Sequence, residues 1–271
     1  MAVKLTIASF TAIELILPPT LFPNKRITLL KKYYLYHTLR KPMDRYSLID
    51  TKMPREFLLL QGHGCRWGKC TFCDYHSDAS PTPFATNKAV LDRVTGKYKR
   101  LDIINSGSAM ELDEDTINYI KEIVAEKGIE ELWFEAHYMY RNRLTEFAKQ
   151  FAPATVKFRC GIESFDATLR KSWNKGIPDN VTATEVAKHF KGICLLCCTQ
   201  GDSKERILSD IATAKQHFEY FSVNLFCNNS TAVKRDEELV KWFIKEVYPQ
   251  IKDDDRIEIL IDNTDLGVGE I

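Results

Sequence analysis

The chain lacks several features that would assign it to common protein classes. Its formal net charge is only +1, so no overall basic field indicates a nucleic-acid-binding protein. It contains no Gly-x-Ser-x-Gly motif, no Walker loop and no His-x-x-x-His pair, which excludes the commonest serine hydrolase, P-loop and zinc-peptidase patterns. It also contains no internal repeat and no low-complexity segment.

The N-terminal apolar stretch lacks the properties of a membrane span or an export signal. Residues 5–22 are apolar, but Glu14 and the pair Pro18-Pro19 interrupt them. Only Lys4 precedes the stretch, and no clear small-residue cleavage site follows it. Eight cysteines without a convincing export signal favour a reducing compartment. We therefore expect a cytoplasmic protein that has no membrane partner.

Residues 24–41 are basic, with six Lys and Arg side chains interleaved with three tyrosines. Such a segment can bind RNA, although a solvated helix face is the commoner explanation for a charge run. We therefore expect that nucleic acid is not a partner. Residues 1–54 are expected to form an N-terminal extension or capping segment, and residues 55–271 the main domain. The alternative that the functional chain starts near Met43 stays open.

Short β-rich runs alternate with helical patterns from residue 55 onward. The expected strands are 56–61, 100–105, 131–135, 155–161, 192–198, 220–226 and 256–261. The expected helices are 87–95, 113–127, 141–151, 164–173, 180–190, 204–217 and 235–247. This alternation predicts parallel strands joined by crossover helices. The pattern alone does not separate an open α/β sheet from a complete or partial barrel.

Three cysteines, Cys65, Cys70 and Cys73, lie within nine residues directly after the first expected strand. Thiolates are the usual ligands of iron–sulfur clusters. Three ligands on a [4Fe–4S] cube would leave one iron open for chemistry. A zinc site usually takes four protein ligands, and His63 or His76 could complete such a set. The sequence therefore predicts a metal or cluster site at these three cysteines.

Small or acidic residues follow three successive strands. In a parallel barrel, ligands gather at the carboxyl ends of the strands. Ser106 and Ser108 flank Gly107 after the second expected strand, and Glu135 ends the third. Glu163 follows the fourth strand, and a carboxylate there is costly to bury unless it is paired or bound. An ordinary turn and helix N-terminal carboxylates are the alternative explanations.

Amide and carboxylate side chains surround the ends of the last two expected strands. Asn224 and Asn228 flank the end of the sixth strand, and Asp262 and Asn263 follow the seventh. These groups can hydrogen-bond the donor and acceptor edge of a small polar heterocycle. We therefore predict that they bind the substrate. Turns favour Asn and Asp, so turn formation alone explains the presence of these residues equally well.

The cysteine segment and the strings after the later strands resemble the radical S-adenosylmethionine (SAM) superfamily. There, three cysteines follow the first barrel strand and an aromatic residue, here Phe72, precedes the third. Four residues separate the first two cysteines of this chain, where three is the commonest spacing. The turn after the second strand is similar to a glycine-rich SAM-binding turn, and Gly161–Phe165 to a recurring Gly-x-Glu segment.

This resemblance covers about residues 55–265 and implies a fold and a cofactor set. The implied fold is a partial (β/α)6 barrel of parallel strands, with a [4Fe–4S] cluster at their carboxyl ends. The implied cluster ligands are Cys65, Cys70 and Cys73. The implied SAM contacts are Phe72, Ser106, Ser108, Glu135 and Glu163. No residue is assigned a catalytic role.

The resemblance also implies a reaction. One electron, from a flavodoxin- or ferredoxin-type donor, cleaves SAM to a 5′-deoxyadenosyl radical that abstracts hydrogen from the substrate. The strings 62–65, 70–75 and 261–267 are most similar to the queuine lyases, which release the cyclopentenediol of queuine and give 7-aminomethyl-7-deazaguanine. Two alternatives stay open: a radical SAM enzyme for another nucleoside or RNA, and a non-catalytic iron–sulfur or zinc module.

Overall fold

The computed structural model describes residues 44–262, which contain a single sheet of eight strands in sequence order. β1 pairs antiparallel with β2, and all later neighbours are parallel. The predicted α/β class with parallel strands is therefore confirmed. The strands are β1 (Tyr46–Ile49), β2 (Arg55–Leu60), β3 (Arg100–Asn105), β4 (Glu131–Glu135), β5 (Thr155–Glu163), β6 (Gly192–Cys197), β7 (Tyr220–Leu225) and β8 (Ile257–Leu260).

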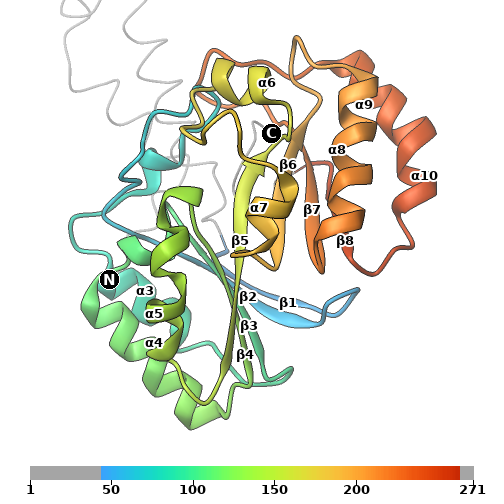
Figure 1. Cartoon of the computed structure of the whole chain (residues 1–271). Coiled ribbons are helices and arrows are strands. Elements are labelled where there is room, and N and C mark those ends of the chain that lie inside the picture. Colours follow the sequence, from blue (N-terminus) through green and yellow to red (C-terminus); the bar gives the residue numbers. More distant parts are fainter. Residues whose placement is uncertain (1–43, 263–271) are drawn as a thin grey trace, which may run out of the picture. The chain divides into compact units, whose positions relative to one another are not determined.

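Helices occupy the crossovers between the strands, and they lie along one face of the curved sheet (Figure 1). The α-helices are α3 (Phe84–Leu91), α4 (Glu114–Lys127), α5 (Leu144–Lys149), α6 (Ala167–Ser172), α7 (Ala183–Ala187), α8 (Lys204–His217), α9 (Glu237–Trp242) and α10 (Tyr248–Ile251). Short 3-10 helices are η1 (Tyr75–Asp78), η2 (Ala109–Glu111) and η3 (Tyr138–Arg143), and η4 (Phe243–Val247) is a π-helical segment that joins α9 to α10.

Local sequence explains where the two longest helices begin. The side chain of Asp113 accepts a hydrogen bond from the backbone N–H of Thr116 at 2.9 Å, which caps α4. The side chain of Ser203 accepts one from the N–H of Arg206 at 3.2 Å, which caps α8. α4 ends at Gly128 with φ +60°, a left-handed conformation that glycine adopts without steric cost.

The outer face of the sheet buries the hydrophobic core against the helices. Alternate strand residues point to this face, because side chains alternate along a strand. Leu58, Leu101, Phe134 and Ile193 are typical, with exposed fractions of at most 1%. Helix residues such as Ile120 of α4 complete the same cluster. Burial of one such side chain contributes roughly 1.5–3 kcal/mol.

Charged side chains of β2, β3, β5 and β8 meet on the inner face, and some of these strands are not neighbours in the sheet. Arg55 of β2 donates to Asp102 of β3 at 2.8 Å, and Arg159 of β5 donates to the same carboxylate at 3.0 Å. Arg55 also reaches Glu258 of β8 at 2.7 Å. Only a curled sheet brings β2 and β8 together in this way, so the expected partial barrel is confirmed. Asp102 is fully buried, and its two arginine partners compensate its desolvation.

The structure departs from the sequence-based expectation at the start of the sheet. β1 precedes residue 55, where we expected the main domain to begin, yet its four residues pair with β2. The expected basic segment and Asn263 lie outside the described residues. Within the described part, no helix is long and apolar enough to cross a membrane.

Candidate functional site

The three predicted cluster cysteines lie on the loop that follows β2, at the carboxyl edge of the parallel strands. Cys65, Cys70 and Cys73 are all free thiols and half-buried. The remaining five cysteines are buried. We call residues 65–73 the cysteine loop.

The turn after α6 fixes one side of the cysteine loop. The backbone N–H of Thr71 donates to the carbonyl of Trp173 at 3.0 Å, and the Asn174 amide donates to the carbonyl of Lys69 at 3.0 Å. In return, the Trp67 indole N–H donates to the carbonyl of Asn174 at 2.8 Å. A Cβ on Gly176, which has φ +71°, would clash with the Trp67 ring. Only glycine leaves room for this ring.

The loop after β7 fixes the other side. The Asn229 amide donates to the carbonyl of Phe72 at 2.8 Å, and the Ser230 hydroxyl donates to the Asp74 carboxylate at 3.1 Å. The Phe72 ring contacts Trp173 edge-on, with centroids 5.5 Å apart. The cysteine loop is therefore held between two segments more than 100 residues further along the chain.

The turn after β3 packs under the same loop. The hydroxyl of Ser106 accepts the N–H of Gly62 at 2.9 Å, and that of Ser108 accepts the N–H of His137 at 3.0 Å. Both serines are 2% exposed. Glu111 accepts the N–H groups of Arg66 and Ser108 at 2.9 and 2.7 Å. Each hydroxyl accepts one of these bonds and keeps its own O–H to donate, so the predicted contact between these serines and SAM stays a prediction.

Two carboxylates and one cation converge above Gly161. A Cβ there would lie 2.7 Å from Glu163 Oε1, 3.2 Å from Lys175 Nζ and 3.4 Å from Glu135 Oε1. Lys175 pairs with Glu163 at 2.8 Å. Burial acts to lower the pKa of Lys175, but the surrounding anionic groups, with Glu163 first among them, together raise it. Burial raises the pKa of Glu135, which has no ion pair among the described residues. The site thus holds one paired and one unpaired carboxylate.

His137 links this group to the cysteine loop. Its ring stacks on Trp67 with centroids 5.9 Å apart, and its Nε2 lies 2.7 Å from the carbonyl of Lys175. Its Nδ1 accepts the N–H of Met139 at 3.2 Å, which leaves Nε2 as the protonated nitrogen of a neutral ring. Burial, reinforced by the charge of Lys175, lowers the pKa of His137 to about 4.

The thiols suit an iron–sulfur cluster by their chemistry. Burial raises the pKa of Cys70 and raises that of Cys73 to about 12, so a metal must displace their protons on binding. Within residues 44–262, no three His, Cys, Asp or Glu side chains converge closely enough to hold a single metal ion. Three thiolates that each hold a different iron of a cluster need not converge on one point. The residues present therefore fit a cluster with three protein ligands.

The predicted substrate residues fall into two groups. Asn224 lies on β7, and its Oδ1 is buried with no hydrogen-bond partner in the described structure. Arg235 engages the other two described residues: its N–H donates to Asn228 Oδ1 at 2.9 Å, and its guanidinium pairs with Asp262 at 3.0 Å. Asn263 lies outside the described residues. Their role in binding substrate stays a prediction. Among the described residues of this set, Asn224 is the one with a buried, unpartnered acceptor oxygen.

Sequence reasoning missed three residues of this site. Lys175 was missed because nothing in the sequence indicates that it pairs with Glu163. Trp67 and His137 gave no signal, because their partners are far along the chain. A carboxylate that is predicted to be buried, such as Glu163, needs a compensating cation. This need is the one signal that could have pointed to Lys175.

Two kinds of comparison with known proteins give no support for a family. No protein-family model matches the chain, and no curated protein matches it. Two solved structures of OxsB, a cobalamin-dependent SAM radical enzyme, have 16% identity over 70% of this chain and 30% of theirs, with TM-scores of 0.36 and 0.37. That similarity is too low to support a conclusion.

A third solved structure is far more similar. It is a queuine lyase from Clostridium spiroforme bound to SAM and queuine, with 39% sequence identity and a TM-score of 0.79. The alignment covers 84% of this chain and all of that one. With the cysteine loop at the carboxyl edge of a partial parallel barrel, this similarity shows that the chain belongs to the queuine lyase family of radical SAM enzymes.

Proposed function

We propose that the protein is a queuine lyase, which binds a [4Fe–4S] cluster through Cys65, Cys70 and Cys73 together with SAM. The observation that carries this proposal is the 39% identity over the full length of a queuine lyase. When bound, the cluster and SAM supply the 5′-deoxyadenosyl radical that abstracts hydrogen from the substrate. The products are the released cyclopentenediol and 7-aminomethyl-7-deazaguanine.

The chain's own residues bind and orient the reactants. The Glu163–Lys175 ion pair offers a fixed carboxylate toward SAM, and Glu135, which lacks an ion pair among the described residues, suits a cationic amino group. Ser106 and Ser108 are proposed to donate their O–H groups to SAM, since each hydroxyl so far only accepts a backbone N–H. Phe72 packs on Trp173 and helps to keep water from the reacting centre.

The last two strands supply the proposed substrate contacts. The unpartnered Oδ1 of Asn224 can accept an N–H from the deazaguanine edge of queuine. We assign Asn228 and Asp262 to the rim of the same region. Because Arg235 already engages Asn228 and Asp262, their contribution is to hold the rim in place.

Electron supply and location complete the proposal. A flavodoxin- or ferredoxin-type protein is proposed as the electron donor. The free thiols of Cys65, Cys70 and Cys73 support the expected cytoplasmic location, since thiols stay reduced in that compartment.

Anaerobic reconstitution followed by mass spectrometry tests the proposal. The protein is incubated with SAM, a chemical reductant and queuine, and the mixture is searched for 7-aminomethyl-7-deazaguanine. Cys70→Ala should form no product. Cys197→Ala is the matched control, since Cys197 is a buried free thiol of β6 that packs in the hydrophobic core and is not part of the cysteine loop. Full activity of Cys70→Ala would contradict the assignment of the cluster ligands.

A further inference from the structure

Glu163 occupies an unusual backbone conformation at the end of β5. Its φ is +66°, and the register between β5 and β6 shifts between Gly161 and Glu163. The left-handed region is unfavourable for a residue with a side chain, because its Cβ crowds the following carbonyl oxygen. Such a conformation persists only where the surroundings fix it. The residues that hold the chain on either side of Glu163 must therefore supply this constraint.

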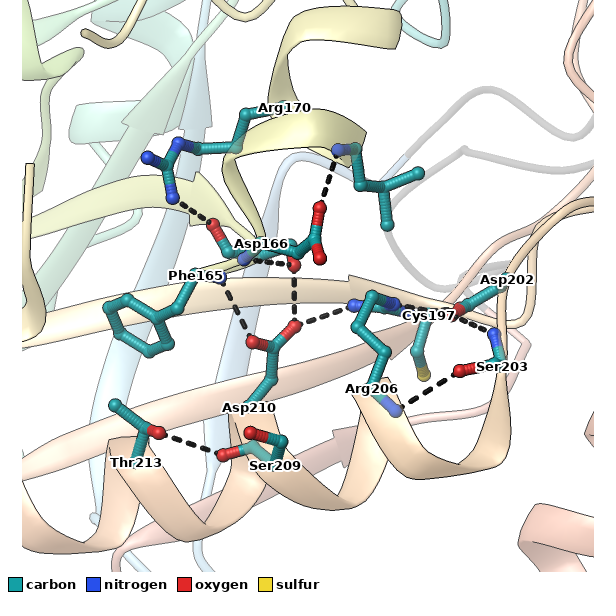
Figure 2. A network of polar contacts seen from close by, with 12 residues as sticks. Phe165, Asp166, Arg170, Cys197, Asp202, Ser203, Arg206, Ser209, Asp210 and Thr213 are labelled. Carbon is teal, nitrogen blue, oxygen red and sulfur yellow. Dashed lines mark hydrogen bonds and ion pairs between the residues drawn. The ribbon is translucent and has the colours of Figure 1, made fainter. Parts of the chain in front are cut away.

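Asp210 of α8 binds the two residues that follow Glu163. Its Oδ2 accepts the hydroxyl of Ser164 at 2.7 Å, and its Oδ1 accepts the backbone N–H of Phe165 at 2.9 Å. Asp210 is 4% exposed and Ser164 is fully buried. Figure 2 shows Asp210 reaching up from its helix toward Phe165 and the turn. A buried carboxylate with these two donors fixes the position of the turn.

Two arginines complete the hold on this turn. Arg206, one helical turn before Asp210, donates to Asp210 at 2.6 Å and also pairs with Asp202 (Figure 2). On the opposite side, the guanidinium of Arg170 donates to the carbonyl of Ser164 at 3.0 Å. The residue after Glu163 is therefore held from two directions, while β5 holds the residues before it.

We propose that Asp210 is a positioning residue that keeps Glu163 in its left-handed conformation and so aims its carboxylate. This role rests on the proposed function, in which Glu163 contacts SAM. Released from Asp210, the turn can rotate at Glu163 toward an ordinary negative φ. The carboxylate would then leave Lys175, which it meets at 2.8 Å. Asp210 acts in this way without touching SAM.

The test compares two similar substitutions of the same network. Asp210→Asn leaves one oxygen in place of two, so the side chain can no longer accept from Phe165 on one side and from Ser164 and Arg206 on the other. Asp202→Asn is the matched control, because Asp202 is a buried carboxylate that pairs with the same arginine but does not contact Ser164 or Phe165. SAM affinity is measured by calorimetry on the reconstituted, reductant-free holoenzyme. Crystal structures of both variants report the φ of Glu163 and the distance from its carboxylate to Lys175.

We expect Asp210→Asn to weaken SAM binding roughly tenfold, since apparent affinity falls with the fraction of molecules in the competent conformation. Asp202→Asn should leave SAM affinity unchanged. In a Glu163→Gln background, Asp210→Asn should cause little further loss, because both changes act through one carboxylate. In the crystal structure of Asp210→Asn, Glu163 should leave the left-handed region and separate from Lys175.

Unchanged Glu163 geometry in the Asp210→Asn crystal structure would overturn the inference, as would full additivity with Glu163→Gln. If the geometry changes while neither Asp210→Asn nor Glu163→Gln alters SAM affinity, the positioning role stands and the proposed SAM contact fails. Should Asp210→Asn not fold, Ser164→Ala takes its place, since it removes one hydrogen bond of the same anchor.

Discussion

His137 should make the stability of the cysteine loop sensitive to mild acid. The ring is 8% exposed, stacks on Trp67 and lies beside Lys175. Burial first, and the Lys175 charge second, lower its pKa to about 4, from about 6.5 in an unfolded chain. The unfolded state therefore binds this proton first as the pH falls. The stabilising contribution is complete above pH 6.5 and is lost between pH 6.5 and about 4.

The size of this effect follows from the shift. Each pKa unit corresponds to about 1.36 kcal/mol, so protonation of His137 should remove about 3 kcal/mol of unfolding free energy over that window. Urea unfolding of the iron-free protein, followed by tryptophan fluorescence from pH 7.5 to 4, measures this loss. His137→Asn removes the titrating ring, so the difference between the two pH profiles isolates it. Parallel profiles would refute the reasoning.

Three further predictions concern the same site. Gly176→Ala should lower iron content after reconstitution, because its methyl group would strike the Trp67 ring; Gly201→Ala, also at positive φ but with no atom within 4 Å, should not. Lys175→Met leaves the buried Glu163 carboxylate without its partner and should lower the unfolding free energy by about 3–5 kcal/mol. Lys188→Met breaks an exposed ion pair and should lower it by only about 0–1 kcal/mol. Glu163→Gln should weaken SAM binding roughly ten- to a hundredfold in calorimetry, and unchanged affinity would remove this contact.

Alternation of apolar runs with helical patterns predicted the sheet well. Each expected strand from 56–61 to 256–261 lies on one of the strands β2 to β8. β1 was missed because four residues with mixed burial carry no clear period. The expected helix 235–247 continues to Ile251 through a π-helical segment that composition does not reveal.

The candidate site was predictable only where residues follow a strand. That rule found the cysteine loop and Glu163, since the residues directly after a parallel strand lie at the carboxyl edge of the sheet. It could not find Asp210, which lies in the middle of α8 and reaches the edge through Ser164. Nor could it reveal that the Ser106 and Ser108 hydroxyls accept backbone N–H groups, because these donors come from other loops.

The dependence of 5′-deoxyadenosine formation on queuine tests the central claim most directly. The reconstituted protein is incubated with SAM and reductant under anaerobic conditions, with and without queuine, and both reactions are followed by mass spectrometry. We predict that queuine accelerates 5′-deoxyadenosine formation and is converted to 7-aminomethyl-7-deazaguanine. Equal rates with and without queuine, with no deazaguanine product, would contradict the lyase assignment.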